Sequence, residues 1–102
     1  MAKDPEVLTI KIRRKRILEY LGIIYGTPIE LGTLYNQIVY VDPTYDISLF
    51  QKDITYLKAK SYIEFIDEKI GGASEYRKKV IGLTADGKEV AEGTDTDDAL
   101  EI

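Results

Sequence analysis

Apolar residues recur at helical spacing along the first quarter of the chain. Ile10, Ile17, Leu21 and Ile24 fall on one stripe, which predicts a helix over residues 7–25. Gly26 follows at once and is suited to end that helix in a left-handed conformation.

A second apolar face is formed at the same spacing by Leu31, Leu34, Tyr35, Ile38 and Val39. Two starts for this helix remain open. Thr27 and Glu30 match a capping box, with Pro28 at the first helical position. Alternatively, residues 27–30 form a short strand that leads into a helix near Leu31.

The turn at residues 42–46 contains Asp42-Pro43 and separates the second helix from a third that begins near residues 46–48. Tyr40 and Tyr45 flank this turn and are candidates to anchor it. Either Asp46 caps the third helix, or Ser48 does so with Gln51 completing a capping box. The predicted core face of this helix consists of Ile47, Phe50, Ile54 and Leu57, and its polar face of Ser48, Gln51, Lys52, Thr55 and Lys58.

After residue 61 the pattern becomes extended. Residues 62–67 and 77–83 are predicted to pair as a hairpin around a tip that contains Gly71-Gly72. Thr84 is a candidate cap for a last helix over residues 85–92, ended by Gly93, and residues 94–102 are expected to be a disordered acidic tail. The predicted fold class is therefore α+β and mostly α, with one domain over residues 1–93.

Two stretches resemble the winged helix-turn-helix superfamily. Residues 54–63 are similar to the end of the recognition helix in MarR-like and PadR-like regulators, and residues 83–91 to the start of the helix after their wing. The resemblance implies a three-helix bundle with a β-hairpin wing and a short C-terminal helix. Two features depart from it. Ser61 stands where these families usually have Gly, and the connection over residues 40–46 is longer than a tight helix-turn-helix turn.

In a helix-turn-helix protein the recognition helix enters the major groove of DNA. By this resemblance, the expected DNA-facing residues of the third helix are Ser48, Leu49, Gln51, Lys52, Thr55 and Tyr56. Those of the wing are Lys69, Arg77, Lys78 and Lys79. On a strand, Arg77 and Lys79 would lie on one face and Lys78 on the other.

The net charge of −4 is unevenly distributed. From Asp86 onward there are seven acidic residues and one basic residue, whereas residues 1–85 hold 13 basic and 11 acidic residues, a net of +2. The basic run at Lys11 and residues 13–16 is expected either to touch flanking phosphates or to pair with acids of the last helix and tail. In the second case the tail would imitate nucleic acid.

The composition argues against an enzyme, because the chain has neither His nor Cys and no glycine-rich phosphate loop. No cofactor and no metal site are expected. The chain also lacks a signal-peptide core and any apolar run near the roughly 20 residues that span a bilayer, so a cytoplasmic protein without a membrane partner is expected.

The expected function is a transcriptional regulator that binds double-stranded DNA. The apolar residues 7–12 favour a homodimer. The alternative is a winged-helix protein–protein interaction module without nucleic-acid binding, which Asp46, Asp53 and the acidic tail favour.

Overall fold

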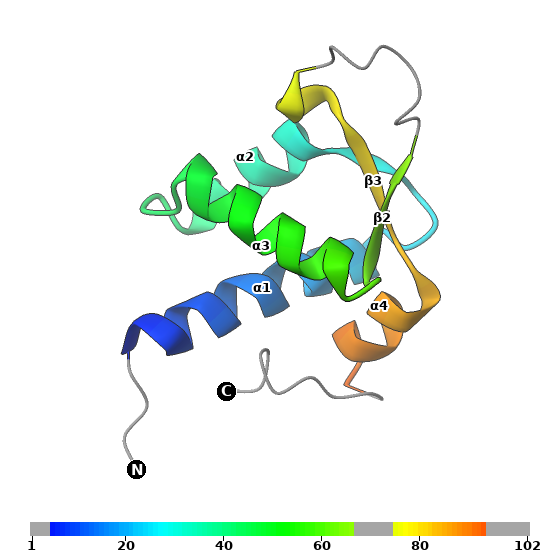
Figure 1. Cartoon of the computed structure of the whole chain (residues 1–102), viewed down its shortest axis with the longest axis horizontal. Helices are drawn as coiled ribbons and strands as arrows, with labels where there is room; N and C mark the ends of the chain where they lie inside the picture. The colour runs from blue at the N-terminus through cyan, green and yellow to red at the C-terminus, as the bar shows by residue number, and fades with distance from the viewer. Residues whose placement is uncertain (1–4, 67–74, 94–102) are drawn as a thin grey trace.

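The computed structural model describes residues 5–66 and 75–93. The predictions for Lys69, for the Gly71-Gly72 tip and for the acidic tail fall outside these residues. The described chain is α+β and mostly helical (Figure 1). Its elements are α1 (Pro5–Ile23), β1 (Ile29–Glu30), α2 (Leu31–Val41), α3 (Ile47–Ala59), β2 (Ile63–Ile66), the 3-10 helix η1 (Tyr76–Lys78), β3 (Val80–Leu83) and α4 (Ala85–Ala91).

The three strands form an antiparallel sheet in the order β1-β3-β2. β3 is the central strand. Its residue Ile81 pairs with Ile29 of β1 along one edge and with Phe65 of β2 along the other. Of the two starts left open for the second helix, the strand is therefore correct and the capping box is wrong. Glu30 is the N-cap of α2 and makes no side-chain capping bond.

Helix caps explain where α3 and α4 begin. The Asp46 carboxylate accepts a hydrogen bond from the Ser48 amide at 2.7 Å, so Asp46 is the cap of α3 rather than Ser48. The Thr84 hydroxyl accepts a hydrogen bond from the Gly87 amide at 3.0 Å, as the sequence predicted. Each cap satisfies an amide that has no partner inside its own helix.

The left-handed backbone positions lie at the ends of helices. Gly26 and Gly93 have φ values of 93° and 80°, which agrees with their predicted roles as helix terminators. Ser61, in the turn between α3 and β2, has a φ of 63°. A side chain at this φ is disfavoured, so the departure from Gly at this position carries a conformational cost.

The predicted strand over residues 77–83 is wrong in its first half. Tyr76–Lys78 form one 3-10 turn, and the strand begins only at Val80. This segment packs closely on α2, since a Cβ added at Gly32 would lie 3.0 Å from the Arg77 carbonyl oxygen. The Lys79 carbonyl also accepts a hydrogen bond from the Leu31 amide at 2.8 Å, which joins the segment to the start of α2.

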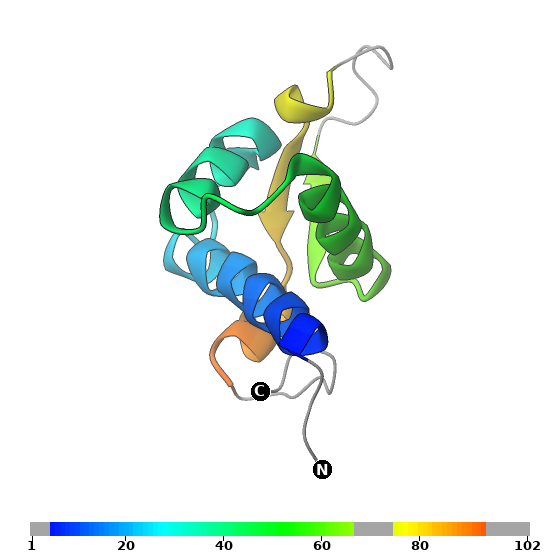
Figure 2. The same ribbon diagram turned by 90° about the vertical axis from the view of Figure 1, so that its left-hand side faces the viewer.

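The core lies between the first three helices and the sheet. Its fully buried side chains include Ile17, Leu18, Leu31, Leu34, Phe50, Leu57 and Ile81. Helix α4 packs on α1 from the side away from α2 and α3 (Figure 2). No helix in the described ranges is both long and apolar enough to cross a bilayer.

Candidate nucleic-acid interface

Helix α3 presents a polar surface opposite its core face. Phe50, Ile54 and Leu57 are buried, as predicted. The exposed residues of the helix are Ser48, Leu49, Gln51, Lys52, Thr55, Lys58 and Ala59. Five of the six residues of this helix that were expected to face DNA are therefore exposed.

Asp53 does not belong to that exposed surface. It is only 4% exposed, and its carboxylate accepts hydrogen bonds from Arg14 Nε at 2.9 Å and from the Tyr45 hydroxyl. Of the two acidic residues near the third helix that favoured the interaction module, Asp53 is therefore buried and ion-paired, whereas the helix cap Asp46 is exposed. Because Asp53 is the one acidic residue of α3, the exposed face of this helix carries Lys52 and Lys58 and no carboxylate.

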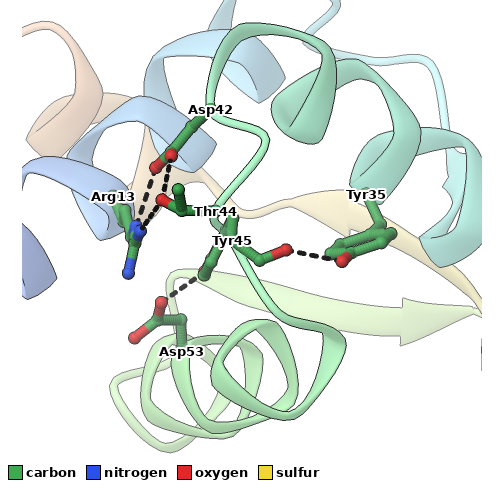
Figure 3. Close-up of polar contacts among 6 residues, drawn as sticks. All are labelled: Arg13, Tyr35, Asp42, Thr44, Tyr45 and Asp53. Atoms are coloured by element: carbon green, nitrogen blue, oxygen red, sulfur yellow. Dashed lines mark hydrogen bonds and ion pairs between the residues drawn. The ribbon is translucent and has the colours of Figure 1, made fainter.

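Arg13, the neighbour of Arg14 on α1, holds the connection between α2 and α3. Its Nε donates to Asp42 Oδ2 at 2.8 Å, and a terminal nitrogen donates to the Thr44 hydroxyl at 3.0 Å (Figure 3). The hydrogen bond from Arg13 lowers the pKa of Asp42 below its ordinary value of 3.8, and the same bond raises the pKa of Arg13. Among the described residues, Arg13 and Arg14 thus pair with Asp42 and Asp53 rather than with acids of α4, and contact of the basic run with phosphates stays a prediction.

Tyr45 ties the same connection into the core. Its ring is 1% exposed, its hydroxyl donates to Asp53, and its carbonyl oxygen accepts a hydrogen bond from the Tyr35 hydroxyl (Figure 3). Burial, followed by the bond to Asp53, raises the pKa of Tyr45 well above its ordinary value. Tyr45 thus anchors the turn, as predicted, whereas Tyr40 is 88% exposed.

Tyr56 occupies a different environment from the other residues of α3 that were expected to face DNA. It is half-buried, and the Arg14 guanidinium carbon lies 3.9 Å from the centroid of its ring. Arg14 therefore covers one face of Tyr56 while it neutralises Asp53. This arrangement makes Tyr56 part of the contact between α1 and α3.

The basic residues of the expected wing separate into two groups. Arg77 and Lys78 are exposed on η1, and the Arg77 guanidinium lies 5.3 Å from the Tyr35 ring on α2. Because η1 is a helical turn, the predicted alternation of these residues on a strand does not apply. Lys79 instead reaches Phe65 of β2, with its Nζ 5.8 Å from the ring centroid.

Two residues absent from the expected site join Lys79 to α3. These residues are Phe65 and Lys58. The Nζ of Lys58 lies 4.5 Å from the centroid of the same Phe65 ring. Lys58 follows Gln51 and Thr55 along one helical face, so its spacing was a usable signal. Phe65 gave no such signal, because a half-buried strand aromatic resembles any core residue.

Within residues 5–66 and 75–93, no group of three or more acidic side chains is placed to hold a metal ion. Comparison of the chain with protein-family models, curated proteins and solved structures found no match. The candidate interface therefore rests on its own geometry and chemistry.

Proposed function

We propose that this chain is a winged helix-turn-helix protein that binds double-stranded DNA as a transcriptional regulator, with α3 as recognition helix and β2–β3 as wing. The observation that carries the proposal is the exposed face of α3, which holds polar and basic side chains while the only acid of the helix is buried against Arg14. The order of three helices, a β-hairpin and a short helix supports the fold assignment.

The side chains on this face have the chemistry needed to bind DNA. Gln51 can form paired hydrogen bonds with adenine, and Lys52 can donate to guanine or to a phosphate. Ser48 and Thr55 carry hydroxyls that bond either bases or phosphates. Residues 1–85 have a net charge of +2, so the body of the protein is compatible with a polyanion despite the total of −4.

A salt titration of binding to mixed-sequence duplex DNA tests the proposal. Affinity measured by fluorescence anisotropy should fall steeply between about 50 and 200 mM salt, because phosphate contacts release counterions. Lys52→Ala should reduce the slope of log affinity against log salt by about one. Lys88→Ala, which removes the same charge from α4, should leave the slope unchanged. Absence of binding at about 50 mM salt would overturn the proposal.

We also propose that two copies associate through the first turns of α1. Leu8, Ile10 and Ile12 are only partly buried there, although residues 7–12 are largely apolar. Sedimentation should give about twice the chain mass of 11.6 kDa. Ile10→Glu should return the protein to a monomer with an unchanged far-ultraviolet circular dichroism spectrum, and a monomeric wild type would refute the association.

A protein–protein interaction module is the second candidate function. It is favoured by exposed apolar side chains outside α3, namely Ile23 at 84%, Tyr40 at 88% and Val41 at 66% exposure. The burial of Asp53 removes one argument for this alternative. Failure to bind DNA across the salt titration, with the fold intact, would leave the interaction module as the better proposal.

A further inference from the structure

Tyr35, near the middle of α2, contacts three other parts of the chain. Its hydroxyl donates a hydrogen bond to the carbonyl oxygen of Tyr45, in the connection that leads into α3 (Figure 3). Its ring centroid lies 5.2 Å from that of Phe50, in the first turn of α3. The guanidinium carbon of Arg77, on η1, lies over the same ring at 5.3 Å from its centroid. One side chain of α2 therefore joins the start of the proposed recognition helix to the base of the proposed wing.

The backbone of Arg77 also packs on α2. η1 lies against this helix (Figure 1), and a Cβ added at Gly32 would lie 3.0 Å from both the Cβ and the carbonyl oxygen of Arg77. The lack of a side chain at Gly32 thus lets η1 approach α2 closely. Gly32 and Tyr35 are neighbours on the helix surface, since residues three positions apart lie on one face. The backbone of Arg77 therefore packs on Gly32 while its guanidinium lies over Tyr35.

No carboxylate neutralises the charge of Arg77 within the described part of the chain. Arg77 is exposed, and its guanidinium makes no hydrogen bond or ion pair there. α2 contributes no carboxylate, because none of its residues is charged. Arg13 and Arg14, in contrast, each form an ion pair with an aspartate. Arg77 thus combines an aromatic contact with hydrogen-bond donors that are open to an anion.

We infer that Tyr35 is a positioning residue that holds Arg77 against one backbone phosphate of the bound DNA, beside the recognition helix. The inference rests on the proposed function and deepens it, because it assigns a role in DNA binding to a residue that the sequence places on the core face of α2. A guanidinium can stack on an aromatic ring while its N–H groups form paired hydrogen bonds with a phosphate. Stacking before DNA arrives restricts the Arg77 side chain, which reduces the conformational entropy lost on binding.

Exchange of Tyr35 separates the effect of the ring from that of the hydroxyl. Tyr35→Leu removes the ring under Arg77 and should weaken binding to duplex DNA about two- to five-fold in fluorescence anisotropy. Tyr35→Phe keeps the ring and should bind as wild type. Tyr25→Leu is the matched control and should leave the affinity unchanged, because it removes a comparable contact beside α4, where Lys88 Nζ lies 4.9 Å from the Tyr25 ring centroid. Equal affinities of Tyr35→Leu and Tyr35→Phe would overturn the inference.

A double-variant cycle shows whether Tyr35 acts through Arg77. Arg77→Ala alone should reduce the slope of log affinity against log salt by about one, because one phosphate contact is lost. In the Arg77→Ala protein, Tyr35→Leu should then cause no further loss of affinity. An undiminished loss in that background would show that Tyr35 acts on α3 through Tyr45 or Phe50 instead, and the positioning role would be wrong.

The free protein provides a readout that does not depend on DNA. NMR relaxation of Arg77 Nε should show a restricted side chain in the wild type and in Tyr35→Phe, and a mobile one in Tyr35→Leu. Equal mobility in the three proteins would refute the positioning role. Should Tyr35→Leu fail to unfold cooperatively in thermal denaturation, Tyr35→Met replaces it in each experiment. A wild type that does not bind DNA would overturn both the proposed function and this inference, whereas DNA binding that does not depend on Tyr35 would overturn the inference alone.

Discussion

Two tyrosine hydroxyls in the core have opposite surroundings. The Tyr45 hydroxyl donates to Asp53, whereas the buried Tyr76 hydroxyl has no hydrogen-bond partner among the described residues. Burial raises the pKa of Tyr76 to about 12, so this hydroxyl stays protonated and its donor remains unsatisfied at neutral pH. An unsatisfied buried polar group destabilises the folded state.

The two residues should therefore respond in opposite directions to removal of the hydroxyl. We expect Tyr76→Phe to raise the free energy of unfolding by about 1 kcal/mol, and Tyr45→Phe to lower it by about 1.5–3 kcal/mol. Urea denaturation measures both values. Tyr40→Phe, at an exposed position, is the control and should change stability by less than about 0.5 kcal/mol. A change of the same sign in the two core variants would contradict this account.

The ion pair between Arg13 and Asp42 predicts a pH dependence of stability. Asp42 has a pKa below 3.8 in the folded protein, because it accepts a hydrogen bond from Arg13. Its stabilising contribution is therefore fully present above the unfolded value of 3.8 and is lost as the pH falls through the lower folded pKa.

Asp42→Asn should remove this titration. Unfolding free energies measured by urea denaturation between about pH 2 and 6 should fall less steeply on acidification in the variant than in the wild type, by on the order of 1 kcal/mol over the range. Asp86→Asn on the exposed surface of α4 serves as the control. Parallel pH profiles for the wild type and Asp42→Asn would refute the role assigned to this pair.

Which residues could be predicted from the sequence depends on how far away their partners are. The roles of Thr84, Gly26 and Gly93 were predictable, because each is set by a few neighbouring residues. The role of Asp53 was not, since its partner Arg14 is 39 positions away in the chain. Its position after Lys52 made it resemble a surface acid, and only tertiary packing shows that it is buried.

At the scale of elements, Arg14 fixes the proposed recognition helix on α1. Its guanidinium neutralises Asp53 and covers Tyr56, and the side chains of Arg14 and Asp53 are 19% and 6% exposed. Removing one partner of such a pair leaves a buried charge without its counterion. Arg14→Ala should therefore lower the free energy of unfolding by about 3 kcal/mol.

Chemical denaturation checks this value, and Lys52→Ala on the exposed face of α3 provides a control with the same charge change. The double variant Arg14→Ala/Asp53→Asn should recover part of the loss, because it removes the unpaired charge. If the free energy of unfolding of Arg14→Ala lies within about 0.5 kcal/mol of the wild-type value, the buried pair does not stabilise the packing of α3 on α1.

The boundaries of the elements were predicted well where side-chain periodicity determines them and poorly where tertiary contacts do. Helices α1 and α4 begin and end within two residues of their predicted limits, and α3 begins at its predicted start. The strand β1 remained one of two alternatives, and η1 was missed. β1 depends on its pairing with β3, and η1 packs against the start of α2, so both involve contacts between residues that lie far apart in sequence. Local propensity carries no information on such contacts.

At the scale of the whole molecule, opposite charges are separated along the chain. The exposed face of α3 carries Lys52 and Lys58. On the far side of α1, α4 exposes Asp86 and Glu89, and Glu92 is exposed directly after this helix. Residues 94–102 add four acids and no base. The sequence shows this asymmetry directly, but only the fold places the acids of α4 away from the proposed interface. A protein of negative net charge thus carries basic side chains on the exposed face of α3, as the proposed function requires.

Removal of residues 94–102 tests how this asymmetry affects binding. The truncation brings the formal net charge from −4 to zero, so repulsion of DNA decreases and affinity should rise several-fold at about 50 mM salt. The gain should shrink at higher salt, where screening weakens the repulsion. A full-length variant with Asn or Gln at the four acidic positions distinguishes charge from chain length and should reproduce the gain. An unchanged affinity in both proteins would show that the acidic segment does not oppose DNA binding.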